Sequence, residues 1–148
     1  MFVPDGFEPP RGLETSDFRL EPLGPEHNER DYEAWSSSIE HIRSSSGYGP
    51  ESSWPRPMTL TENLVDLERH ASDFAAGTGF TYTVLDAGDD VIGCVYVYPA
   101  RDDVHDASVE SWVRVSRAEL DPVVRATVAE WLASSWPFRR PLYEPLLD

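Results

Sequence analysis

Apolar and polar positions along the chain follow two periods, one typical of strands and one typical of helices. Phe18 and Leu20 alternate with charged residues in segment 18–23, which predicts a first strand. Apolar side chains then recur every three or four positions and predict a helix over residues 25–42: Tyr32, Trp35, Ile39 and Ile42. The serine-, glycine- and proline-rich segment 44–58 is expected to be a loop that serves as a linker or a binding lid.

The clearest helix is predicted directly after this loop. Thr59 and Glu62 have the spacing of a capping box, in which each side chain accepts a hydrogen bond from the other residue's backbone N–H. An apolar stripe follows at helical spacing: Leu60, Leu64, Leu67, Ala71 and Phe74. Gly77 is expected to end the helix.

The second half of the chain predicts a run of strands and one more helix. Segments 80–85, 91–98 and 109–114 are rich in β-branched and aromatic residues and are joined by short turns. Pro122 suits the first turn of a helix over 122–132, and a final strand falls within 138–147. Three consecutive strands with short turns predict an α/β domain with a mixed, mostly antiparallel sheet and helices on its faces. We expect this domain to cover residues 18–148, after an N-terminal extension over residues 1–17.

Charge narrows the choice of partners. The chain has 148 residues, 12 of them Lys or Arg and 27 Asp or Glu, for a formal net charge of −15. Such a field repels nucleic acids and anionic membranes and attracts amines. The single cysteine, Cys94, lies in an apolar run and predicts a buried thiol, and no histidine has a partner at metal-ligand spacing. Without an apolar stretch long enough to cross a membrane, we expect a cytoplasmic protein.

Four segments carry a resemblance to a known family: FRLEPLGPEH at 18–27, DDVIG at 89–93, ASVESWV at 107–113 and the helical segment 123–132. Their order and spacing resemble those of the GNAT (N-acetyltransferase) superfamily over about residues 18–136. The resemblance implies a V-shaped cleft between adjacent strands, where acetyl-CoA binds and an amine attacks its thioester. It also implies a general base on a strand and a hydroxyl or water that protonates the departing thiolate.

The resemblance further implies that the cofactor lies against the segment before the last helix: Val113, Arg114, Val115, Ser116 and Arg117. The family has a Gln/Arg-x-x-Gly-x-Gly/Ala loop here, and backbone N–H groups of its glycine-bearing turn bind the pyrophosphate. In this chain Ser116, Glu119 and Asp121 occupy the three family positions. The two carboxylates would repel phosphate, and Ser116 and Glu119 could instead form a capping box. The chain is also short for the family after Trp136, which leaves three alternatives for the missing edge of the sheet: the N-terminal arm fills it, a second subunit in a homodimer fills it, or it stays open.

Candidate chemistry falls on two groups of residues. Glu110 lies on the strand that often holds the family's base, and Tyr143 is the candidate proton donor by its late position. A pocket with aromatic walls for a flat or cationic small molecule is predicted from Tyr48, Trp54, Met58, Tyr96 and Tyr98, and His70 is a further candidate for the lining of the cleft. Surface, loop or core positions are the alternative for each of these side chains.

Three functions therefore stay open at the level of sequence. The first is an acyl-CoA-dependent N-acyltransferase that acts on a small amine and holds the cofactor through altered contacts such as Arg114 or Arg117. The second is a protein of this fold that does not use acetyl-CoA and binds or converts another small molecule in the aromatic cleft. The third is a non-catalytic interaction module with an open sheet edge.

Overall fold

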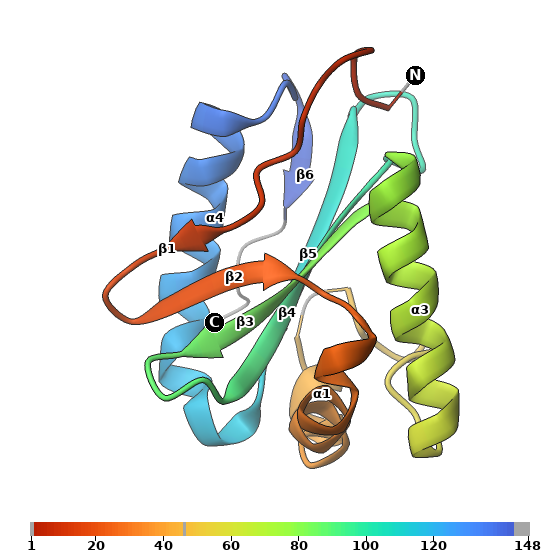
Figure 1. The fold of residues 1–148 in the computed structure, drawn as a ribbon, viewed down its shortest axis with the longest axis vertical. Helices are drawn as coiled ribbons and strands as arrows, with labels where there is room; N and C mark the ends of the chain where they lie inside the picture. The colour runs from red at the N-terminus through yellow and green to blue at the C-terminus, as the bar shows by residue number, and fades with distance from the viewer. Residues whose placement is uncertain (1, 46, 144–148) are drawn as a thin grey trace.

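The computed structural model of the protein describes residues 2–45 and 47–143. Figure 1 shows its elements, which follow one another along the chain as β1 (Leu13–Glu14), β2 (Phe18–Pro22), η1 (Pro25–His27), α1 (Asn28–Ser36), α2 (Ile39–Arg43), α3 (Leu60–Ala76), β3 (Phe80–Asp86), β4 (Val91–Tyr98), β5 (Ala107–Val113), η2 (Val115–Leu120), α4 (Asp121–Ser135) and β6 (Pro141–Tyr143). The two η elements are 3₁₀ helices.

The sheet confirms the predicted fold class. Its strands lie in the order β1-β2-β3-β4-β5-β6, and every neighbouring pair is antiparallel except β5 and β6, which are parallel. Helices α1 and α3 lie to one side of the sheet and α4 lies to the other (Figure 1). No helix in the described part of the chain is both long and apolar enough to span a bilayer.

Two hydrophobic cores lie on the two faces of the sheet, because successive side chains of a strand point to opposite faces. On β4, Val95 and Val97 belong to the core under α4, whereas Cys94 and Tyr96 belong to the core under α1 and α3. On β5, Val109 and Val113 contact the first core and Trp112 the second. Cys94 is buried, as its apolar surroundings predict.

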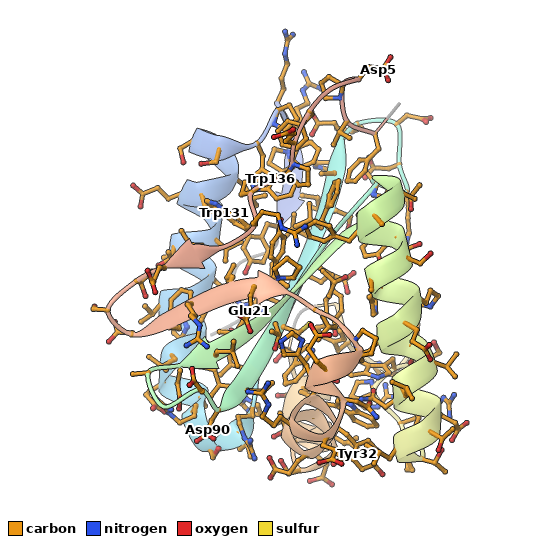
Figure 2. The ribbon with its side chains drawn as sticks, in the orientation of Figure 1. Asp5, Glu21, Tyr32, Asp90, Trp131 and Trp136 are labelled. Carbon is orange, nitrogen blue, oxygen red and sulfur yellow. The ribbon has the colours of Figure 1, made fainter. Side chains whose placement is uncertain are left out.

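The N-terminal extension packs against the domain in its described part. The ring of Phe2 stacks on Phe80 and Phe138, with centroids 5.9 and 5.4 Å apart. Trp136 lies edge-on to Trp131 of α4, with centroids 5.4 Å apart, close to the incoming N-terminal segment (Figure 2). Strand β1 extends the sheet next to β2, at the edge opposite β6. The predicted homodimer stays a prediction.

Two sequence predictions of element bounds need correction. The single helix expected over 25–42 is divided into η1, α1 and α2, because the chain leaves the helix at Ser37 and Ser38. Ser38 is buried at this break, and its Oγ accepts a hydrogen bond of 2.9 Å from the N–H of Val115. The last strand is only three residues long, Pro141–Tyr143, and the remainder of the predicted segment lies outside the described residues.

The inward face of α3 also differs from the apolar stripe predicted for it. The Thr59–Glu62 capping box and the terminal Gly77, in the left-handed conformation, are present as predicted. Leu60, however, is 40% exposed, and the buried residues of the helix are Asn63, Leu67 and Phe74. The buried face of α3 therefore differs from the predicted apolar face, since it includes the polar Asn63 and excludes Leu60.

Candidate functional site

A pocket of about 550 Å³ opens between helix α3, the loop after α2, and strands β4 and β5. Its walls come from segments that are distant in sequence: Asp31 of α1, Tyr48 and Trp54 of the loop, His70 of α3, Tyr96 and Tyr98 of β4, and Glu110 of β5. The structure thus brings together the residues predicted to form the aromatic pocket, Met58 included, with His70 and Glu110 beside them. Tyr143 does not line this pocket.

The pleat of the sheet explains this gathering. Tyr96 and Tyr98 are two residues apart on β4 and therefore point to the same face. Glu110 pairs directly with Tyr96 across the antiparallel β4–β5 ladder, so its side chain joins that face. Ser111, the next residue, points to the opposite face, where its Oγ lies 2.6 Å from the Oη of Tyr143. The two predicted catalytic residues, Glu110 and Tyr143, consequently belong to opposite faces of the sheet.

Aromatic side chains make the inner wall rigid. Trp54 packs against Trp35, Tyr48 and Trp112, with ring centroids 5.5, 5.7 and 5.9 Å apart. The Trp112 indole donates a hydrogen bond of 3.0 Å to the Oη of Tyr96. The buried Oη of Tyr48 has no hydrogen-bond partner among the described residues. Burial, together with the charge of Glu110, raises the pKa of Tyr48 far above its ordinary value, so this hydroxyl stays protonated.

A short chain of hydrogen bonds bears on the tautomer of His70. The Oη of Tyr98 donates to the Asp73 carboxylate over 2.8 Å, and the Nδ1 of His70 lies 2.9 Å from the same Oη. Because the single proton of the tyrosine is used on Asp73, we expect Nδ1 to carry a proton, which the Oη of Tyr98 and the Oγ1 of Thr81, 3.0 Å from Nδ1, can both accept. The other ring nitrogen, Nε2, is then an acceptor. Gly79 makes room for this chain of hydrogen bonds, since a Cβ there would lie 2.0 Å from the Tyr98 ring.

We expect His70 to stay neutral between pH 5 and pH 8. Burial and, to a smaller extent, the nearby Arg69 lower its pKa from 6.5 to about 4, although Asp73 opposes the shift. Nitrogen NMR shifts of the imidazole should show an Nδ1–H tautomer with no titration in this range. In the variant Tyr98→Phe, the remaining partner of Nδ1 is the Thr81 hydroxyl at 3.0 Å, which can donate, so the proton should move to Nε2. A midpoint near 6.5 in the wild type would contradict this assignment.

Asp31 is a pocket residue that sequence reasoning missed. Its side chain is 4% exposed and accepts a hydrogen bond of 3.1 Å from the Asn63 amide. Burial raises its pKa to about 6, although the Asn63 hydrogen bond and His27 oppose the shift. Two signals pointed to this site: Asp31 precedes Trp35 by four residues, and Asn63 precedes Leu67 by four, so each polar residue shares a helix face with a core residue.

The segment predicted to contact the cofactor instead makes ion pairs and hydrogen bonds with other parts of the protein. Arg114 pairs with Glu33 over 2.7 Å, and Arg117 pairs with Asp86 and with Glu119, the latter over 3.3 Å. Val113 is buried in the core under α4. The N–H of Val115 donates to Ser38, and residues 115–120 form two 3₁₀ turns that are separated by a kink at Arg117. The N–H of Arg117 donates to the carbonyl of Arg114, and the N–H of Asp121 donates to the carbonyl of Ala118, three residues earlier in each case.

Neither carboxylate of this segment behaves as the sequence predicted. The capping box between Ser116 and Glu119 is absent, since neither η2 nor α4 has a side-chain hydrogen bond at its N-cap. Asp121 turns inward, where its Oδ1 lies 3.3 Å from the Nε of Arg125, and both side chains are less than 10% exposed. Arg125 in turn donates to the carbonyl of Ser111 on β5 over 3.2 Å.

Comparison with known proteins shows which solved structures share this arrangement of strands and helices. No protein-family model matches the chain, and no curated protein sequence matches it. Solved structures do match. They include the ribosomal-protein-S5-alanine acetyltransferase of Vibrio fischeri (TM-score 0.62, 12% identity, covering 82% of this chain and 66% of that one). They also include RimL, a ribosomal L7/L12 alpha-N-protein acetyltransferase, in complex with coenzyme A (TM-score 0.62, 11% identity, covering 82% of this chain and 68% of that one). A third match is the microcin C7 self-immunity acetyltransferase MccE in complex with acetyl-CoA and AMP (TM-score 0.62, 12% identity, covering 86% of this chain and 70% of that one).

The chain has the GNAT fold. It spans about two thirds of the length of these structures, 66, 68 and 70% respectively. The segment between β5 and α4 is the one that the sequence resemblance predicts to lie against the pyrophosphate of the cofactor. This chain fits that role poorly, because both of its arginines are paired with acids and its backbone is wound into η2.

Proposed function

We propose that the protein binds a small molecule with an amino group in the pocket between α3, β4 and β5, and that it does not hold acetyl-CoA through the loop before α4. The observation that carries the first part is a buried carboxylate, Asp31, inside a pocket with aromatic walls. Aromatic faces and a carboxylate together favour a cation over a neutral or anionic ligand. The net charge of −15 favours the approach of the same class of ligand.

The second part rests on the electrostatics of the segment 114–121. Binding of a pyrophosphate there would require Arg114 and Arg117 to leave three carboxylates: Glu33, Asp86 and Glu119. It would also require the N–H groups of Arg117 and Asp121 to leave the carbonyls of Arg114 and Ala118. Those carboxylates would then stand unpaired beside two further negative charges, which is unfavourable at protein-like dielectric.

N-acylation of the bound amine by an acyl-CoA is the second candidate function. The position of Glu110 favours it, because this carboxylate lies opposite Tyr96 on the pocket face of β5, in a fold shared with acetyltransferases. In that function Glu110 is the group that accepts the proton of the amine.

Titration calorimetry with acetyl-CoA separates the two functions. We expect no heat of binding and no rise in melting temperature at millimolar acetyl-CoA, whereas a ligand present at 100 times its Kd stabilises a protein by about 2.7 kcal/mol. Free coenzyme A serves as a control for binding that does not involve the acetyl group. Micromolar binding of acetyl-CoA would instead establish the acyltransferase function, and Glu110→Gln should then lower turnover without weakening the binding of acetyl-CoA.

A further inference from the structure

The Asp31 carboxylate stands out among the charged groups of the protein because it is buried and only partly hydrogen-bonded. Among the described residues it accepts one hydrogen bond, from the Nδ2 of Asn63. An ionised carboxylate has about four acceptor sites. It forms no ion pair with any Lys or Arg in the described part of the chain. Asp31 therefore has room for a further donor, and the pocket lies against it.

The surroundings hold this carboxylate in one position. The Asn63 amide also donates to the Oδ1 of Asn28 over 2.9 Å and accepts from the Trp35 indole over 3.1 Å. These bonds fix which side of the amide faces Asp31. Asp31 and Tyr96 line the same pocket. The geometry is that of a preorganised acceptor in the pocket wall.

Burial raises the pKa of Asp31 despite a smaller opposing effect of the nearby His27, and none of the arginines that line the pocket pairs with the carboxylate. The arginines that line the pocket are Arg56, Arg69 and Arg101, and all three are exposed. Arg69 faces two other carboxylates, those of Asp66 and Asp73, at 3.7 and 4.0 Å. Burial of a carboxylate without a counter-charge opposes folding, so a group of this kind is explained best by a cation that comes from outside the chain.

We propose that Asp31 binds the ammonium group of the ligand and thereby makes the pocket selective for amines over their neutral analogues. This inference rests on the proposed function, because it names the residue that recognises the amine. The ligand's ammonium donates to the open acceptor sites of Asp31, while its apolar part packs between the rings of the pocket, Tyr96 and Trp54 among them. Asp31 is a binding residue in this proposal and takes no part in bond making.

Calorimetry with matched pairs of probes tests the proposal. The probes are benzylamine, 2-phenylethylamine and 3-phenylpropylamine, each compared with the alcohol of the same carbon skeleton. The wild-type protein should bind at least one of the amines at least tenfold more tightly than its alcohol, since hydrogen bonds to charged groups are worth about a factor of ten or more. Asp31→Asn should weaken that amine at least tenfold and leave the affinity for the alcohol within threefold.

Glu29→Gln is the matched control, because it removes one negative charge from the same helix at an exposed position. It should change the amine affinity less than threefold, and circular dichroism should show that both variants are folded. Equal binding of the amine by wild type and Asp31→Asn would overturn the role of Asp31 and leave the proposed function standing. Equal binding of amine and alcohol by the wild type would overturn the selectivity. Failure of the wild type to bind any of the amines would overturn the proposed function itself.

Discussion

Asp31→Asn is expected to raise the free energy of unfolding by about 2 kcal/mol at pH 8, while it removes the proposed affinity for amines. The pKa of Asp31 is raised from 3.8 to about 6, chiefly by burial. A shift of this size corresponds to about 3 kcal/mol of preference for the protonated form, and we expect the amide to recover most of it. Asparagine resembles the protonated acid in shape and can still accept the hydrogen bond from Asn63.

The sign of the pH dependence follows from the raised pKa. Above pH 6 the carboxylate is ionised in both the folded and the unfolded protein, so its burial costs the most. Below pH 4 it is protonated in both, and the cost disappears. The stabilisation by Asp31→Asn should therefore be largest at pH 7–8 and fall towards zero at pH 4. His27 and Asp66, the other titratable groups that act on Asp31, are present in both proteins.

Urea unfolding of wild type, Asp31→Asn and Glu29→Gln at several pH values measures this difference. Glu29→Gln should change the stability by less than about 0.5 kcal/mol, because that side chain is exposed. A loss of stability in Asp31→Asn would show that the carboxylate is needed for the fold. A gain in stability with a loss of amine binding is the pattern expected of a residue kept for function at a cost in stability.

Asp121→Gly, which places the family's glycine in the loop before α4, is expected to lower the free energy of unfolding by about 3 kcal/mol and to confer no binding of acetyl-CoA. The substitution leaves the guanidinium of Arg125 in a nearly buried position without the carboxylate that lies 3.3 Å away. Removal of one partner of a buried ion pair typically costs about 3–5 kcal/mol. We place this pair at the lower end, because burial raises the pKa of Asp121 and Arg125 keeps the Ser111 carbonyl as an acceptor.

Denaturant unfolding and acetyl-CoA calorimetry on the same variants check both parts. Glu119→Gly is the matched control, since Glu119 is exposed and should cost no more than about 1 kcal/mol. The double variant Asp121→Gly with Arg125→Leu should recover part of the loss, because leucine needs no counter-charge. If Asp121→Gly binds acetyl-CoA, the carboxylate alone blocks the loop, and the 3₁₀ winding of η2 is no barrier.

The sequence predicted those features that depend on contacts between near neighbours. The capping box at Thr59 and Glu62 and the left-handed Gly77 fix α3 locally, and the structure contains both. The strands β3, β4 and β5 follow from runs of β-branched and aromatic residues with short turns. Tyr96 and Tyr98 share a face of β4 because alternation along a strand is a local property, whereas the pairing of Glu110 with Tyr96 is seen in the structure.

The structure corrected those predictions that depend on which partner a side chain meets. Ser38 ends the first helix because it accepts the N–H of Val115, a residue 77 positions later. Asp121 was expected at the mouth of a phosphate loop, but it turns towards Arg125 one helical turn away. A buried carboxylate pairs with a cation that lies close to it in space. The position of the carboxylate in a sequence motif does not reveal which cation that is.

By itself, the sequence determined the order of the longer strands and helices, the acidic charge and the aromatic residues available for a pocket. Only the tertiary structure decided that these aromatic residues meet around Asp31, and that the arginines before α4 meet Glu33 and Asp86. The physical reason is the separation along the chain over which each kind of interaction acts. Backbone periodicity and capping act over a few residues, whereas burial and ion pairing depend on distances in space, which the packing of α1 and α3 on the sheet sets.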